Sequence, residues 1–554
     1  MGDTLLGHPD IGQTGGGNRV LPPGDVFDEA MPGLLLGPLL RHVDSRSATV
    51  WVETDAPCTV AVAGARTRTF TAGGHHYALV VVTGLEPGTS TPYEVELDGE
   101  TVWPPPDFPP SRIRTFPEEG DPEFVMLFGS CRKPIDPGLG FDALAAYAKR
   151  MRDQDEKDWP DALMLLGDQV YADETTDATK KWISERRSLD KPPGGEVIDF
   201  EEYTHLYHES WDEPLARWLM STVPTSMIFD DHDVRDDWNT SQTWRDEMAR
   251  TDWWDERERG ALVSYWIYQH IGNLSPADLD QDEVYQRVVK AEGDVGELLH
   301  EFAERARQEV NGSKGTRWSY RRDFGNVRLL VIDTRSGRIL SGGARSMVGD
   351  GEFEWIEENA TGDFDHLLIG SSLPWLMPHA ISYLQTLNEV ACRQPGWRGR
   401  LGEKLRQSGD LEHWPSFRAS SDRLAKLVRR IADTDTATVS VLSGDVHHGY
   451  AAKVTFPTPV RAAVYQLVCS PVHNMLPWYV KPFFFLSWRR SLAAVLRRRM
   501  LRKVDPLPVD WEKVGGPWLG NMVATLRASG RDAEMLMERV EGEELKRIAT
   551  VPLK

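Results

Sequence analysis

Short apolar runs that end abruptly in polar residues are the clearest pattern along the chain. Each run is too short for a typical helix and has the composition of a buried parallel strand. The five runs are Phe124 to Phe128, Ala162 to Leu166, Ser226 to Phe229, Arg328 to Ile332 and Ala437 to Leu442. Each is followed by charged or potentially ligating residues. In open α/β sheets the ligand crevice lies beyond the carboxyl ends of the strands, so the pattern predicts one shared site.

Helical spacing of apolar residues appears between these strands. The clearest stretches are Phe141 to Ala148, Ala261 to His270, Gly296 to Val310 and Asp422 to Ala432. Strands that alternate with helices predict a sheet with helices on its faces. We therefore expect an α/β catalytic domain over residues 119–554, with a helical insertion at about 174–312 and a C-terminal extension at about 476–554. The many tryptophans of the insertion are interpreted as core residues.

The sequence before Glu123 has a different pattern, with strand-like runs that do not alternate with helical ones. Residues 1–29 are rich in Gly, Pro and Asp and are expected to form an extended lead. Short β-rich runs separated by turns predict an immunoglobulin- or fibronectin-like β-sandwich over residues 30–118. The runs are Ala48 to Glu53, Cys58 to Val62, Tyr77 to Val82 and Tyr93 to Leu97. The proline-rich stretch Pro104 to Pro110 is interpreted as a stiff connector.

Composition narrows the functional class. The chain has 63 basic and 85 acidic residues and a net charge of −22, which argues against a general nucleic-acid-binding surface. Four cysteines in 554 residues do not make a disulfide framework. We find neither the pattern of a secretory signal nor an apolar run of transmembrane length. The expected location is cytoplasmic, and secretion remains an open alternative.

The segment 479–503 is unusual in so acidic a chain, because it contains many arginines and no acid. Its aromatic and aliphatic residues could form one face of a helix that lies on an anionic membrane. The other interpretation is a helix packed on the domain, with its arginines meeting an acidic surface. We favour the packed helix, because a single amphipathic pattern is common in helices that never meet a membrane.

The residues at the strand ends suggest metal and phosphate chemistry, although each has an ordinary alternative. Asp445 and His447 together suit a metal ion. Cys131 alone would more often be a buried small apolar residue, and the acidic run around His232 could simply cap a helix. A second set could contact phosphate oxygens. It consists of Arg132, Asn239 and Arg335, of which Arg335 could equally form a structural ion pair.

The motifs occur in a definite order, which is more specific than any one of them. They read FGSCRKP, GDQVYAD, FDDHDVRDDWN, VIDTRSGR and LSGDVHHGY. Over roughly residues 120–475 this set resembles the PhoD-like (alkaline phosphatase D) metallophosphatases. The resemblance implies a metallophosphatase-type α/β sandwich of layered sheets flanked by helices, with an N-terminal β-sandwich domain. It also implies cleavage of phosphate monoesters, diesters or both, with iron(III) plus calcium or another divalent ion such as magnesium or manganese.

The resemblance also assigns roles to single residues. Asp168 would bridge two cations, while the Cys131 thiolate and the Tyr171 phenolate would bind iron(III). Asp445 stands where the wider superfamily has a histidine, which makes the second site oxygen-rich and favours a hard ion. His448 is expected beside the ligands rather than among them. The full expected ligand set is Cys131, Asp168, Tyr171, Asp231, Asp445 and His447.

His232 stands where the superfamily has its catalytic histidine. We expect it to hydrogen-bond the phosphate or protonate the leaving oxygen, with Asp233 orienting the imidazole. The nucleophile would be a metal-bound water or hydroxide, and the substrate a small-molecule phosphate ester. Two alternatives remain. One is a membrane-associated phospholipase or phosphodiesterase that uses 479–503, and the other is a metal-stabilised binding protein without turnover.

Overall fold

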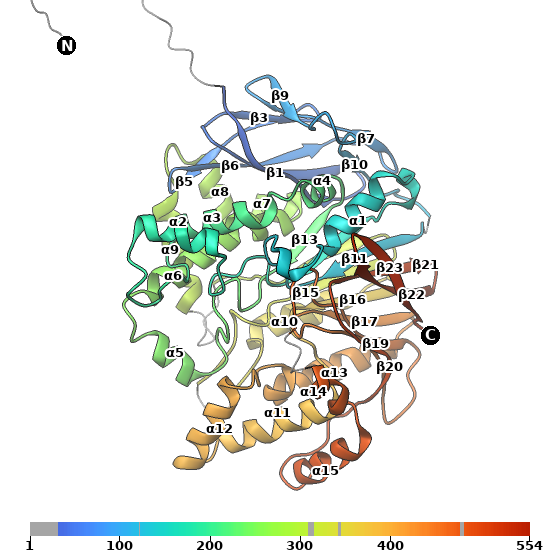
Figure 1. Ribbon diagram of the computed structural model, residues 1–554. Helices are drawn as coiled ribbons and strands as arrows, with labels where there is room; N and C mark the ends of the chain where they lie inside the picture. Colours follow the sequence, from blue (N-terminus) through green and yellow to red (C-terminus); the bar gives the residue numbers. More distant parts are fainter. Residues whose placement is uncertain (1–30, 121, 309–314, 342–344, 477–480) are drawn as a thin grey trace, which may run out of the picture. The chain divides into compact units, whose positions relative to one another are not determined.

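The computed structural model describes residues 31–554 apart from 121, 309–314, 342–344 and 477–480 (Figure 1). The expected lead, residues 1–29, lies outside the described residues. Residues Pro32–Lys554 form one compact unit. Among the described helices, none combines the length and the apolar character needed to cross a membrane.

The N-terminal region is built from strands, as its short β-rich runs separated by turns predict. Two four-stranded sheets have the orders β1-β2-β6-β5 and β4-β3-β8-β9, and β7 pairs with β10. The proline-rich stretch Pro104 to Pro110 joins β9 to β10, so it connects two strands within the N-terminal region. The strands are β1 (Leu34–Val43), β2 (Ser47–Thr54), β3 (Thr59–Val62), β4 (Ala65–Arg68), β5 (Phe70–Ala72), β6 (His75–Thr83), β7 (Ser90–Pro92), β8 (Val95–Leu97), β9 (Glu100–Trp103) and β10 (Arg112–Arg114).

This β-structure is anchored to the rest of the unit by buried polar contacts. The guanidinium of Arg41 on β1 donates hydrogen bonds to the carbonyl oxygens of Thr225 (3.0 Å), Tyr268 (2.8 Å) and Gln269 (2.6 Å). Trp51 on β2 packs against Tyr268, with ring centroids 5.2 Å apart. A buried arginine satisfied by another segment's backbone is costly to expose, so these contacts favour a fixed junction.

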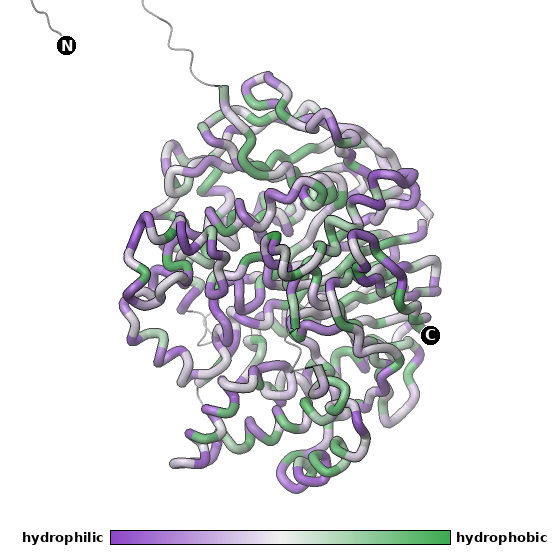
Figure 2. Tube along the Cα trace, viewed as in Figure 1, coloured by the Kyte–Doolittle hydropathy of each residue, from purple (hydrophilic) through white to green (hydrophobic). Residues whose placement is uncertain are grey.

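Two larger sheets form the centre and confirm the expected α/β architecture. Their orders are β13-β12-β11-β21-β22-β23 and β14-β15-β16-β17-β19-β18-β20. The five predicted buried strands are β11, β12, β13, β15 and β17, and Figure 2 shows hydrophobic residues concentrated along the central strands. The strands are β11 (Phe124–Gly129), β12 (Ala162–Leu166), β13 (Thr225–Ile228), β14 (Tyr320–Phe324), β15 (Val327–Ile332), β16 (His366–Ser371), β17 (Thr438–Ser443), β18 (Gly449–Thr455), β19 (Ala463–Val468), β20 (Asp510–Trp518), β21 (Met522–Ser529), β22 (Asp532–Glu541) and β23 (Glu544–Pro552).

The last strands of the chain belong to both central sheets. β21 pairs antiparallel with β11, the first strand of the catalytic region. β20 pairs antiparallel with β18 in the other sheet. Residues 510–552 of the expected C-terminal extension therefore form strands of the two central sheets.

Helices cover the sheets, and polar caps begin several of them. The side chains of Asp142, Thr176, Asp199 and Ser241 each accept hydrogen bonds from backbone N–H groups in the first turn of their helix. In the insertion, Trp211, Trp218 and Trp266 are buried, as expected for core residues. The helices are α1 (Ala143–Arg152), α2 (Asp177–Arg186), α3 (Phe200–Trp211), α4 (Pro214–Thr222), α5 (Gln242–Met248), α6 (Trp254–Ser264), α7 (Pro276–Gln281), α8 (Glu283–Lys290), α9 (Gly296–Gln308), α10 (Asp350–Asn359), α11 (His379–Cys392), α12 (Trp397–Gln407), α13 (Arg418–Ala432), α14 (Lys481–Ser487) and α15 (Arg490–Met500).

Candidate functional site

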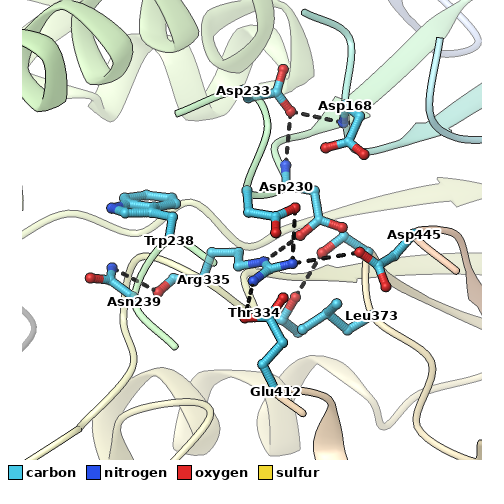
Figure 3. Close-up of polar contacts among 12 residues, drawn as sticks. Asp168, Asp230, Asp233, Trp238, Asn239, Thr334, Arg335, Leu373, Glu412 and Asp445 are labelled. Carbon is cyan, nitrogen blue, oxygen red and sulfur yellow. Dashed lines mark hydrogen bonds and ion pairs between the residues drawn. The ribbon is translucent and has the colours of Figure 1, made fainter. Parts of the chain in front are cut away.

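The strand ends meet at one place, as the apolar runs predict. Cys131 Sγ, after β11, lies 3.2 Å from Asp168 Oδ2, after β12. Arg335, after β15, lies 3.1 Å from Asp231, after β13, and 3.6 Å from Asp445, after β17. Figure 3 shows Asp168, Asp230 and Asp445 around this centre, with Arg335 between the carboxylates. Five segments far apart in the sequence thus contribute to a single site.

The backbone at these strand ends adopts an uncommon conformation. Cys131, Asp168, Asp445 and His447 have φ angles of 60°, 52°, 66° and 48°. Residues other than glycine seldom adopt left-handed φ angles, and such strain gathers at functional sites. The concentration of four such residues in one place marks this centre independently of its side chains.

One side of the centre combines a thiol, a phenol and an imidazole. The hydroxyl of Tyr171 lies 3.5 Å from Asp168 Oδ2, the oxygen that Cys131 also approaches. Asn474 Nδ2 lies 2.9 Å from the Tyr171 hydroxyl oxygen and 3.3 Å from His447 Nε2. Burial, followed by neighbouring negative charge, raises the pKa of Cys131 and of Tyr171 well above their usual values. A cation held here would reverse that effect, because it favours the thiolate and the phenolate.

The other side of the centre is rich in carboxylates. Two groups of three bring their oxygens within 4.8 Å of one another: Asp168 with Asp230 and Asp231, and Asp231 with Glu412 and Asp445. Asp168 Oδ1 and Asp230 Oδ2 are buried and lack hydrogen-bond partners among the described residues. Burial raises the pKa of both carboxyls well above the usual range. Buried oxygens without a donor are costly, and a hard cation would satisfy them.

Arg335 contacts the carboxylates of the centre. Its side chain is 0% exposed and forms an ion pair with Asp230. It contacts Glu412 at 2.5 Å, in addition to the contacts with Asp231 and Asp445 given above. Figure 3 shows its guanidinium among Asp230, Glu412 and Asp445. Arg335 therefore forms the ion pairs that its alternative interpretation describes, and its contact with phosphate stays a prediction.

Arg132 and Asn239 also have partners within the fold. The Arg132 guanidinium is buried and donates to Asp142 Oδ2 at 2.7 Å, at the start of α1. Asn239 donates to the backbone oxygen of Arg335 at 3.2 Å and accepts from Arg245 at 2.8 Å. These contacts engage both side chains within the fold, and phosphate binding by Arg132 and Asn239 stays a prediction.

His232 is oriented by a different carboxylate from the one expected. Its Nδ1 lies 2.9 Å from Asp173 Oδ1. Asp233 instead accepts backbone N–H bonds from Asp168 and Asp230, both at 2.8 Å, so it shapes the turns that carry the other acids. Burial lowers the pKa of His232, but the carboxylates of Asp173, Asp168 and Asp231 together outweigh it, and the pKa is raised well above the usual value. Because a carboxylate oxygen accepts, Nδ1 donates in this contact, and His232 lines a cavity described below.

Three residues that the motifs did not indicate complete the centre. Glu412 and His413 lie between α12 and α13, and His413 Nε2 contacts Asp445 Oδ2 at 2.8 Å. Asn474 follows β19 and joins Tyr171 to His447. None of them follows directly on an apolar run, so the pattern that located the other residues does not apply. His448 lies outside this group, because its Nδ1 contacts the Val446 backbone oxygen at 2.7 Å and its ring packs on Tyr450.

A cavity of about 1190 Å³ opens onto the centre. Its polar end is lined by Asp168, Asp231, His232, Asp445 and His447. These residues include candidate ligands and the candidate catalytic imidazole, and Arg398 and Lys503 also line the cavity. The arrangement can hold cations and present them, with His232, to an anionic group in the cavity.

Comparisons with known proteins find family models that match the chain and solved structures with a similar fold. The family model described as PhoD-like phosphatase matches residues 126–482, and a domain of unknown function matches residues 31–115. A solved structure titled "Structure of PhoD" shares 12% identity at a TM-score of 0.58 and covers 95% of this chain and 94% of that one. A purple acid phosphatase from yellow lupin (Lupinus luteus) seeds shares 12% identity at a TM-score of 0.50, covering 94% of this chain and 74% of that one. A comparison with curated protein sequences finds no match.

Proposed function

Because this chain belongs to the PhoD-like phosphatase family and is a phosphatase, we propose that it hydrolyses phosphate monoesters, diesters or both at a metal centre where the five strands end. The observation that carries the proposal is the meeting of Cys131, Asp168 and Tyr171 with two groups of carboxylates at one end of a cavity. His232 lines the same end and supplies a group for proton transfer.

The donor atoms divide into two kinds, which suggests two kinds of cation. A thiolate, a phenolate and an imidazole from Cys131, Tyr171 and His447 suit iron(III), with Asp168 as a bridging carboxylate. Asp231 and Asp445, with Asp168, offer only oxygen, which suits calcium, magnesium or manganese. Asp230 and Glu412 add further oxygens to this second set. When bound, such cations lower the pKa of water and neutralise charge on a phosphate.

The chain's own residues then orient the substrate and move a proton. Asp173 holds the imidazole of His232 through Nδ1, so Nε2 can donate to a phosphate oxygen or to the leaving oxygen. Asp233 fixes the turns of Asp168 and Asp230 through backbone hydrogen bonds. Arg335 neutralises part of the buried negative charge and keeps the carboxylates together.

Hydrolysis of bis-p-nitrophenyl phosphate tests the proposed function. We expect the purified protein to release p-nitrophenolate, to lose turnover with a calcium-selective chelator, and to regain it when calcium is added. The oxygen-rich ligand set is the physical reason, because it holds a hard divalent ion more weakly than the thiolate-containing set holds iron. Full turnover after removal of every metal would overturn the proposal, and so would no turnover of mono- or diesters with metals bound.

Iron at the thiolate side predicts a coloured protein. A thiolate and a phenolate on iron(III) both give charge-transfer absorption in the visible range. We expect Tyr171→Phe to bleach or shift this band while the protein stays folded, and the chelator that removes calcium to leave the band in place. Tyr465→Phe, a matched change on β19, should leave the spectrum as it is. A colourless, fully active protein that contains only zinc would contradict the iron assignment.

Peripheral membrane contact through 479–503 remains a prediction. Helix α15 packs against α11, where Ala493 and Met500 are buried beside Tyr383. Arg497, Arg498 and Arg499 are exposed. The buried face supports the packed-helix interpretation, while the exposed arginines leave a basic surface.

A further inference from the structure

The cavity extends far beyond the group of candidate ligands. Pockets of roughly 300–1,000 Å³ hold whole drug-sized molecules, so about 1190 Å³ exceeds what a phosphate group alone can fill. The wall of the added space includes polar and charged residues such as Gln394, Arg398 and Lys503, but most of it is formed by apolar side chains. They are Met377, Ile381, Leu384, Leu387, Ala391, Trp397, Leu401, Leu405, Leu411, Leu476 and Phe484.

Two helices form most of this apolar wall. Helix α11 contributes Ile381, Leu384 and Leu387, and helix α12 contributes Trp397, Leu401 and Leu405. Trp397, Leu401 and Leu405 are 64%, 49% and 52% exposed. Large apolar side chains that are exposed together, beside a charged centre, are a feature of ligand-binding grooves. One cavity thus combines the acids of the centre with a mainly apolar wall from these two helices.

We infer that the substrates are phosphate esters whose organic group is a long hydrocarbon chain, as in a lipid phosphate ester. This inference rests on the proposed function and specifies its substrate class. A phosphate held at the acidic end is covalently joined to its organic group, so that group must extend into the space that opens from the centre. An apolar chain there replaces water against leucine side chains, which is favourable in proportion to the area covered.

The reaction in this cavity is a hydrolysis and needs no reactant other than water. The water oxygen forms a bond to phosphorus, and the P–O bond to the leaving group breaks. The leaving oxygen receives a proton, with His232 as its source, and the proton of the attacking water passes to the medium. The products are an alcohol and a phosphate that carries one ester group fewer.

A series of p-nitrophenyl alkyl phosphates tests the inference. The metal-loaded protein is assayed with methyl, butyl and octyl esters below the concentrations at which they aggregate. Full burial of one methylene group raises the affinity for a ligand about fourfold. Because the groove is partly open, we expect kcat/KM to rise about twofold per methylene, or about 100-fold from methyl to octyl. Equal kcat/KM across the series, with the methyl ester hydrolysed, would overturn the inference and leave the proposed function intact.

Variants of the wall identify where the chain lies. Leu401→Ser with Leu405→Ser should cut the octyl-to-methyl ratio about tenfold, because two apolar side chains leave the groove. Val289→Ser on α8 is the matched control, since Val289 is 46% exposed and lies outside the cavity. It should leave the ratio unchanged. An unaltered ratio in the double variant, with normal melting temperature and metal content, would overturn the assignment of the cavity.

Binding separates this inference from the proposed function. Titration calorimetry of the metal-loaded protein with methylphosphonate and octylphosphonate measures the chain-length effect without turnover, because their P–C bonds are not hydrolysed. Tighter binding of octylphosphonate that is lost in the double variant supports the cavity assignment, even if no ester is hydrolysed and the proposed function fails. Equal binding of the two phosphonates would overturn it.

Discussion

His232→Ala should lower the turnover of bis-p-nitrophenyl phosphate by about 10²- to 10⁴-fold, the usual contribution of a positioned general acid or base. The imidazole lines the polar end of the cavity, and its Nδ1 is held by Asp173 at 2.9 Å. It is not among the groups proposed to bind metal. Steady-state kinetics and metal analysis of the same sample should therefore show lost turnover with near-normal metal content.

Two further variants make this prediction specific. Asp173→Asn keeps the size of the side chain but weakens the hold on the imidazole, so we expect a smaller loss of turnover than for His232→Ala. His300→Ala, on helix α9 and outside the cavity, should behave like the wild type. Unchanged activity in His232→Ala would remove this residue from the mechanism, whatever the metal content.

Asp168→Asn should abolish phosphoesterase activity and weaken metal occupancy on both sides of the centre. Asp168 lies close to Cys131 and Tyr171 through Oδ2, and it also belongs to the carboxylate group with Asp230 and Asp231. An amide cannot offer the negative charge that two cations would share. We expect losses larger than the about 10- to 100-fold that follows removal of an outer hydrogen-bond partner.

The stability of this variant distinguishes a ligand from a structural acid. In the metal-free protein, burial and nearby carboxylates raise the pKa of Asp168, so its charge destabilises the fold. Asp168→Asn should therefore melt no lower than the wild type without metal, and lower than the wild type with metal. Asp199→Asn, a change that keeps the cap of α3, is the matched control and should retain metals and activity. Retention of both metals with near-normal turnover in Asp168→Asn would contradict the bridging role.

The sequence located most of the centre because its signal is local. An apolar run followed by Gly167 and Asp168, or by Gly444 and Asp445, shows both the strand and the point where it ends. Parallel strands bring their carboxyl ends to one edge, so the meeting of Cys131, Asp168 and Asp445 follows from the pattern alone. The order of the motifs then identified the family.

The remaining differences between prediction and structure concern side-chain contacts that cannot be deduced from the spacing of residues in the sequence. Asp173 and Asp233 are both near candidate ligands along the chain, and only the folded turns decide which carboxylate meets His232. Arg132 follows a strand end as the ligands do, yet its long side chain reaches Asp142 in the interior. His413 approaches Asp445 from a connection between helices, across 32 residues of chain.

The C-terminal strands and the apolar cavity were missed for a related reason. β21 enters the sheet beside β11, and nothing in the sequence of either strand specifies a partner some 400 residues away. Leu401 and Leu405 have the spacing of an ordinary buried helix face. Only the fold shows that they face open space next to the acids.

The metal content of the purified protein, measured together with its turnover, tests the central claim most directly. Elemental analysis is performed before and after exhaustive chelation, and bis-p-nitrophenyl phosphate hydrolysis is assayed on each sample. We predict iron and a hard divalent ion in comparable amounts before chelation, loss of turnover with their removal, and recovery when both are restored. Protein that holds no metal above trace levels and still hydrolyses the ester at its full rate would contradict a metal centre at the strand ends.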